Sequence, residues 1–105
     1  MDDAKYISDA QQRLLAVILT LAGQEMAGLL PGQIAKQAEC SPSQVTRDLS
    51  NLKHAGWAEE VPGQPGRWRL GPTIVSVAVR HTAGIDRARR RLDEITRRYG
   101  SEAAA

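Results

Sequence analysis

Polar side chains that could form hydrogen bonds with a charged partner recur along one stretch of the sequence, residues 41–55. In a helix, which advances about 100° per residue, side chains at i, i+4 and i+7 share one face. The apolar residues with that spacing are Val45, Leu49 and Leu52. The opposite face then carries small, polar and cationic side chains, namely Ser43, Arg47, Ser50, Asn51 and His54. Hydroxyl, amide and guanidinium groups presented together can hydrogen-bond to phosphates or to polar groups of a ligand.

Local signals mark both ends of this helix. Ser41 is a favourable N-cap, Pro42 suits the first helical position, and Gln44 can complete a capping box with Ser41. Gly56 can adopt the left-handed conformation that ends a helix. The sequence therefore predicts a helix with clear boundaries that buries one face and exposes the other.

The neighbouring segments must position that helix. A short helix is predicted over residues 31–38, followed by a tight turn at residues 39–40, so that two helices are joined closely. Residues 57–61 and 67–70 are predicted to be strands, because five residues rich in Gly and Pro separate them. By strand alternation, Trp68 and Leu70 would point inward and Arg67 and Arg69 outward.

The predicted fold class is mainly α with a small β-hairpin, a winged helix-turn-helix with N-terminal and C-terminal flanking helices. With 105 residues the chain has room for a single domain, residues 1–105, with a limited core. We expect the core over residues 8–71, linker-like or dimerisation helices over 72–100, and a disordered tail over 101–105. Gly84 is expected to interrupt the C-terminal helical region.

Catalysis is not expected. The candidate nucleophiles or general bases are His54, His81 and Cys40, which lie in separate predicted elements. No carboxylate pair and no metal-ligand spacing accompanies them. We therefore predict no enzyme activity, no metal and no cofactor. The longest apolar run, residues 14–19, is far shorter than the roughly 20 residues that span a bilayer. This run, the acidic start and the lone cysteine predict a cytoplasmic protein without membrane contact.

Charge is distributed unevenly along the chain. The net charge is +2, but residues 1–60 carry five Lys/Arg against eight Asp/Glu, whereas residues 61–105 carry nine against four. A basic C-terminal half would suit contact with phosphates, although it is equally compatible with a merely solvated helix surface.

Three segments together resemble the winged helix-turn-helix domain of the IclR family of bacterial transcription regulators. They are residues 30–49, residues 52–57, and the Gly-Arg-Trp-Arg-Leu-Gly run of residues 66–71. The resemblance covers roughly residues 8–100 and implies a bacterial or phage DNA-binding regulator. In the family a linker helix leads to a larger effector-binding domain. That domain is not part of this chain, so no small-molecule effector is expected.

The resemblance implies which side chains would contact double-stranded DNA. It places Ser41, Ser43, Gln44, Thr46 and Arg47 on the recognition helix, and Arg67 beside the tip of the wing. Gln44 could pair with adenine and Arg47 with guanine, and Thr46 could touch a thymine methyl. The serines would hold phosphates. Arg67, with Gln64 at the loop tip, could enter the minor groove or contact the backbone. Arg47 could instead be a phosphate contact or a structural anchor.

Surplus apolar surface predicts a homodimer. The first helix, beginning near Ser8, has a second apolar face with Leu15 and Leu19. Further along, Ile85, Ala88, Leu92, Ile95 and Tyr99 follow the 3-4 spacing of a coiled-coil seam. The expected dimer contacts are Leu15, Leu19, Leu92, Ile95 and Tyr99. The alternative is a seam packed on its own domain.

The sequence thus predicts a sequence-specific DNA-binding transcriptional regulator. The recognition helix, residues 41–55, would enter the major groove, and the wing, residues 61–70, would contact the adjacent minor groove or backbone. The alternative is a winged-helix adaptor that binds another protein and binds DNA weakly or not at all, because the half containing the recognition helix is net acidic.

Overall fold

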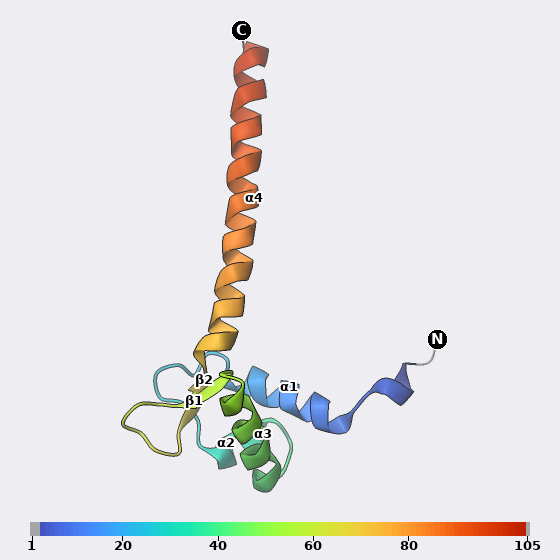
Figure 1. Cartoon of the computed structure of the whole chain (residues 1–105), viewed down its shortest axis with the longest axis vertical. Helices are drawn as coiled ribbons and strands as arrows, with labels where there is room; N and C mark the ends of the chain where they lie inside the picture. Colours follow the sequence, from blue (N-terminus) through green and yellow to red (C-terminus); the bar gives the residue numbers. More distant parts are fainter. Residues whose placement is uncertain (1–2, 105) are drawn as a thin grey trace. The chain divides into compact units, whose positions relative to one another are not determined.

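The computed structural model describes residues 3–104, with side chains described up to residue 100. These described residues form a 3-10 turn, four α-helices and one antiparallel hairpin (Figure 1). These elements are η1 (Ala4–Tyr6), α1 (Asp9–Leu21), α2 (Pro31–Gln37), α3 (Pro42–His54), β1 (Ala58–Glu60), β2 (Trp68–Leu70) and α4 (Pro72–Ala104). The predicted fold class, mainly helical with a small hairpin, is confirmed.

The chain divides into two compact units, one ending at Ile74 and the other beginning at Val75. The first unit contains α1, α2, α3 and the hairpin, and the second consists of most of α4. The assignment of a core to residues 8–71 and of dimerisation helices to residues 72–100 stays a prediction.

One hydrophobic core holds the first unit together. The buried face of α3 is the predicted one, because Val45, Leu49 and Leu52 are all at most 4 % exposed. They meet two apolar residues of α1 and two of α2, and Trp68 and Leu70 of the hairpin pack against the same cluster. The contributions of α1 and α2 are Val17, Leu21, Ile34 and Ala35. Burial of this face fixes the rotation of α3, so that its polar face is turned to solvent.

Capping interactions start the helices where the sequence predicts. The hydroxyl of Ser41 accepts a hydrogen bond from the Gln44 amide N–H at 3.2 Å, and the Gln44 Oε1 accepts one from the Ser41 N–H at 3.0 Å. This is the predicted capping box, which satisfies two backbone donors. The hydroxyl of Ser8 similarly accepts from the Gln11 N–H at 3.3 Å at the start of α1.

The turn between α2 and α3 is tight because one residue adopts a left-handed conformation. Glu39 has φ +56°, and the next amide, of Cys40, donates to the Ala35 carbonyl at 3.0 Å. This bond closes the end of α2 and directs the chain straight into α3. The predicted tight turn at residues 39–40 is confirmed.

The hairpin gains a third strand-like partner that the sequence did not indicate. β1 and β2 pair antiparallel, with Ala58 opposite Leu70 and Glu60 opposite Trp68. Leu29, which lies outside the strands predicted at residues 57–61 and 67–70, exchanges two backbone hydrogen bonds with Trp68, at 2.9 and 2.8 Å. The hairpin is thereby joined to the chain that precedes α2.

Two glycines allow the end of α3 to approach the start of α4. Gly56 has φ +79°, and a Cβ on Gly71 would meet the Gly56 carbonyl oxygen and, at 3.0 Å, the Ala58 nitrogen. Backbone bonds hold the crossing, since Gly71 N–H donates to Trp57 at 2.8 Å and Thr73 N–H to Gly56 at 3.0 Å.

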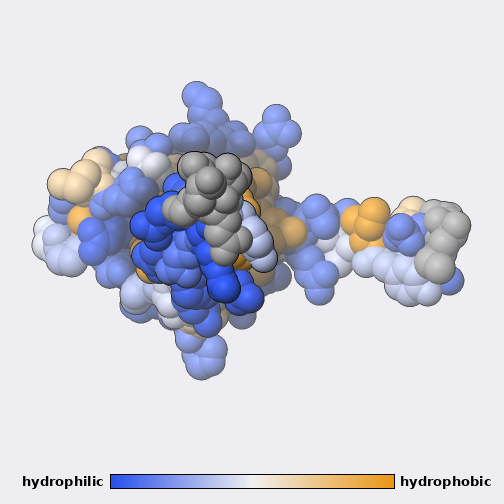
Figure 2. Space-filling view, turned by 90° about the horizontal axis from the view of Figure 1, so that it is seen from above, coloured by the Kyte–Doolittle hydropathy of each residue, from blue (hydrophilic) through white to orange (hydrophobic). Residues whose placement is uncertain are grey.

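Several large hydrophobic side chains of the first unit remain exposed. Leu15 and Leu19 of α1 are 51 % and 75 % exposed, and Ile7, which precedes α1, is 59 % exposed. Figure 2 shows hydrophobic patches of this kind interrupting a mostly hydrophilic surface. None of the described helices is long and apolar enough to cross a membrane.

α4 is one continuous helix, which corrects two predictions. Gly84 lies inside it and does not interrupt it, because its neighbours on both sides keep helical geometry. The helix also includes residues 101–104, where a tail was expected, while residue 105 of that tail lies outside the described residues.

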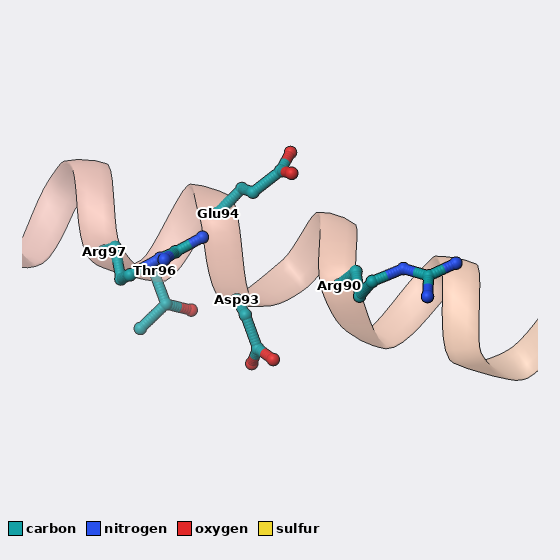
Figure 3. A pocket seen from close by; sticks show the side chains of 5 residues that line it. All are labelled: Arg90, Asp93, Glu94, Thr96 and Arg97. Atoms are coloured by element: carbon teal, nitrogen blue, oxygen red, sulfur yellow. The ribbon is translucent and has the colours of Figure 1, made fainter.

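The charged side chains of α4 are mostly independent of one another. Figure 3 shows Asp93 and Glu94 pointing to opposite sides of the helix, while Arg90 and Arg97 both extend along it. The ion pair found on the described part of α4 joins Arg89 to Asp86 at 4.0 Å. Residues of opposite charge four positions apart, such as Arg90 and Glu94, form no ion pair within that distance on the described part of α4, so such pairs contribute little to holding the helix.

Replacing Gly84 by alanine is expected to stabilise α4 by about 0.5–1 kcal/mol, because glycine is costly inside a helix. The added methyl group has room, since its nearest neighbour would be the Arg87 guanidinium at 3.6 Å. Circular dichroism should show a higher helix content or a higher unfolding temperature. A loss of helix signal would contradict the continuous helix.

Candidate nucleic-acid interface

The outer face of α3 is a solvent-exposed strip of polar side chains. Ser43, Thr46 and Arg47 are exposed, as is Ser41 at the N-cap, and Gln44 is half-buried. The structure therefore brings together the five residues that the IclR resemblance placed on the recognition helix. Ser50 and Asn51 are exposed on the same helix one turn further on.

Most of these polar groups are already oriented by the helix itself. The Thr46 hydroxyl donates to the Pro42 carbonyl at 3.0 Å, and the Ser50 hydroxyl donates to the Thr46 carbonyl at 3.0 Å. The Asn51 amide nitrogen donates to the Arg47 carbonyl at 2.9 Å. Because the hydroxyl protons are used internally, Thr46 and Ser50 offer acceptor lone pairs to an incoming ligand.

Gln44 is less available than the sequence suggested. Its carbonyl oxygen accepts the Ser41 N–H in the capping box, and a bidentate contact with adenine needs that oxygen as well as the amide nitrogen. Such a contact would break the cap. In the capped state Gln44 can still offer its amide N–H groups to an acceptor.

Arg47 is the side chain of this face with the greatest capacity to attract an anion. It is exposed, and no other described side chain pairs with its guanidinium. It lies beside Asn51 at the rim of a shallow groove of about 290 Å³ between α1 and α3. The structural-anchor role that the sequence left open for Arg47 belongs instead to another arginine.

That anchor is Arg13 of α1. Its Nε and Nη2 donate to the two carboxylate oxygens of Asp48 at 2.7 and 2.9 Å, a bidentate pair that ties α1 to α3. The hydrogen bond to Asp48 raises the pKa of Arg13. Asp48 is 5 % exposed, and sequence analysis missed it. The available signal was an acidic residue adjoining the apolar face of α3 and a basic one within the apolar stretch of α1.

The predicted wing, residues 61–70, together with the strand β1 before it forms a hairpin with a compact loop. The Val61 N–H donates to the Arg67 carbonyl at 2.8 Å, and the Gly66 N–H donates to the Glu60 carboxylate at 3.0 Å. Gln64 is exposed at the loop and Arg67 is half-buried. These two predicted contact residues therefore lie on one structured loop.

The wing presents fewer unpaired cations than its sequence suggests. Arg69 does point away from the core, but it pairs with Glu59 at 3.6 Å and donates to the Glu25 carbonyl at 3.2 Å. Lys53 lies 4.0 Å from Glu60 and 5.8 Å from the Trp68 ring centre. Within the described part of the wing, Arg67 is the arginine without an acidic partner.

The residues predicted as dimer contacts are not brought into this face. Leu15 and Leu19 lie on α1, and Leu92, Ile95 and Tyr99 lie on α4, where they are 62 %, 45 % and 64 % exposed. Among the described residues, no group of three or more His, Cys, Asp or Glu side chains is placed to hold a metal ion.

Comparison with known proteins identifies the fold through solved structures. No protein-family model and no curated protein sequence matches the chain. A Silicibacter protein assigned to the IclR transcriptional regulators is 25 % identical with a TM-score of 0.60, and the match covers 78 % of this chain and 32 % of that one. This chain therefore spans about a third of that regulator's length.

Two further structures share the fold. The Zalpha domain of Carassius auratus PKZ, solved in complex with Z-DNA, is 25 % identical with a TM-score of 0.50, over 60 % of this chain and 98 % of that domain. An S. aureus MepR variant bound to an oligodeoxyribonucleotide is 18 % identical with a TM-score of 0.51, over 86 % of this chain and 66 % of that protein. The fold of the first unit is the winged helix-turn-helix.

Proposed function

We propose that the protein is a sequence-specific DNA-binding transcriptional regulator. The observation that carries the proposal is the outer face of α3, a capped helix with an exposed, unpaired Arg47 on a winged helix-turn-helix. The Silicibacter regulator and the two nucleic-acid complexes among the similar structures support it. The IclR resemblance is the narrower form of this proposal, and a cytoplasmic location without enzyme activity would follow.

In the proposed complex α3 enters the major groove of duplex DNA. Arg47 would read guanine or hold a phosphate, and the Thr46 methyl would contact thymine. Ser41 and Ser43 would bind phosphates at the start of the helix, where the positive end of the helix dipole also favours anions. Gln44 would donate from its amide nitrogen while its oxygen stays in the cap. Gln64 and Arg67 would contact the adjacent minor groove or backbone.

The proposed regulator is a homodimer. Leu15 and Leu19 on α1, and Leu92, Ile95 and Tyr99 on α4, expose large apolar surfaces that a second copy would cover. Dimerisation would also double the number of phosphate contacts. This matters because, among the described residues near α3, the first unit has few cations without an acidic partner, namely the exposed Lys36 and Arg47 and the half-buried Arg67.

The test is binding to duplex DNA at two salt concentrations. For protein bound through Z phosphate contacts, the logarithm of the binding constant falls with the logarithm of salt with a slope of about −0.9Z. The protein should shift random and genomic duplexes, with a steep salt dependence. Duplex held in the Z form is a necessary second probe, because one similar structure binds it. Absence of any shift at low salt would favour the protein-binding adaptor.

Replacing Arg67 by alanine should lower affinity and reduce the salt slope by about one unit per protomer, the signature of one lost phosphate or groove contact. The matched control is Arg69→Ala on the same hairpin. Its guanidinium is already paired with Glu59, so it should change the slope much less. Equal slopes for the native protein and Arg67→Ala would mean that the wing does not touch DNA.

A further inference from the structure

The apolar seam of α4 is longer than the sequence spacing first indicated. Because Gly84 does not interrupt the helix, the 3-4 spacing that begins at Ile85 extends backward to Ala78, with the polar residue His81 at one of its positions. From Ala78 to Tyr99 the seam therefore covers three heptads. The described side chains of the second unit include none that is buried, so the seam has no partner within that unit. A helix exposing such a seam gains most of its stability from a partner helix.

The two flanks of this seam carry opposite charge. One flank holds Arg80, Arg87, Arg91 and Arg98, with a single acidic residue among them, Glu94. The other flank holds Asp86 and Asp93, with Arg89 already paired to Asp86 at 4.0 Å. The remaining arginines, Arg90 and Arg97, lie opposite the seam. The first flank is therefore cationic and the second weakly acidic.

This asymmetry distinguishes the possible arrangements of two helices. In a parallel pair, the flank on one side of the seam meets the opposite flank of the partner, so arginines face the side that carries Asp86 and Asp93. In an antiparallel pair, like flanks meet, and Arg91 and Arg98 would face arginines. Like charges facing one another across a seam are unfavourable and select against that orientation.

We propose that α4 pairs with a second copy of itself as a parallel, in-register, two-stranded coiled coil along the Ala78–Tyr99 seam. The inference rests on the homodimer included in the proposed function and adds its orientation. In register, Arg91 of one helix lies next to Thr96 of the other, five residues further on, a position where an acidic side chain would form an interhelical pair. Because each winged-helix unit precedes its own α4, parallel pairing places both units at the same end of the coiled coil. Two copies of α3 could then reach one duplex.

Orientation can be tested with single cysteines. In a Cys40→Ser background, His81→Cys and Ile95→Cys each place one thiol in the seam, about 21 Å apart along a helix. Parallel, in-register helices bring both positions against their own copies, so both variants should form covalent dimers on mild oxidation. In an antiparallel pair, only residues near the symmetry axis meet their own copies. At most one of the two cysteine variants could then form a covalent dimer. Cross-linking of one variant or of neither would overturn the proposal.

A charge pair at one position provides an independent test. Thr96→Glu should tighten the dimer and Thr96→Arg should weaken it, with dissociation constants that differ on the order of tenfold. Within one helix, residues 91 and 96 lie on opposite flanks, so the difference should vanish in an Arg91→Ala background only if the two residues meet between chains. A difference that persists without Arg91 would contradict the register.

Binding of the cross-linked dimers to duplex DNA separates this inference from the proposed function. Dimers from both cysteine variants that bind no DNA would support the parallel pairing and overturn the regulator. If the protein fails both orientation tests and still binds DNA, the regulator is supported and the parallel pairing is overturned.

Discussion

Replacing Arg47 by alanine is expected to weaken DNA binding by about 1–3 kcal/mol, roughly 5- to 150-fold, without unfolding the domain. The guanidinium is exposed and has no partner among the described side chains, so its removal leaves no buried group unsatisfied. The core face of α3, with Val45 and Leu49, is untouched. Affinity should be measured by fluorescence anisotropy, and folding by circular dichroism.

The pattern of the loss distinguishes the two roles of Arg47. If it reads a base, the loss should be confined to sequences that carry that base, whereas a phosphate contact should weaken binding to all sequences alike. Lys5→Ala removes an equal charge from η1, away from α3 in the sequence, and serves as the control. A folded Arg47→Ala protein that binds with full strength would remove the outer face of α3 from the interface.

Replacing Leu92 by aspartate is expected to convert the proposed dimer into monomers. The side chain is 62 % exposed in the single chain, and in a coiled coil it would be buried against its own copy. Two unpaired carboxylates in an apolar seam should cost several kcal/mol. Light scattering at tens of micromolar should then give the monomer mass, and DNA affinity should fall because each duplex is contacted by one unit.

A carboxylate on the other side of the same helix provides the control. Ala83→Asp carries the same helix-propensity cost but lies away from the seam, so it should leave the dimer intact. If the native protein itself has the monomer mass at that concentration, the seam is not a dimer interface. A dimer that binds DNA with both units predicts paired half-sites about 34 Å apart, and a monomer would contradict that prediction as well.

The sequence alone predicts the start and the buried face of α3, but it does not predict that α4 continues through Gly84. Val45, Leu49 and Leu52 are buried because a helical period of 3.6 puts them on one face, whatever lies beyond it. The capping box of Ser41 and Gln44 and the pairing of Ala58 with Leu70 across a Gly/Pro-rich turn depend on residues close together in the chain.

Contacts between distant segments could not be determined in this way. The Arg13–Asp48 pair joins residues 35 positions apart, and the bridge from Leu29 to Trp68 depends on how the hairpin lies against the loop before α2. The hydrogen bond from Arg69 to the Glu25 carbonyl likewise joins residues 44 positions apart. Local periodicity sets which face of an element is apolar, but packing decides which other element meets that face. Packing in the tertiary structure therefore decided which charges are tied up in pairs and left Arg47 and Arg67 available.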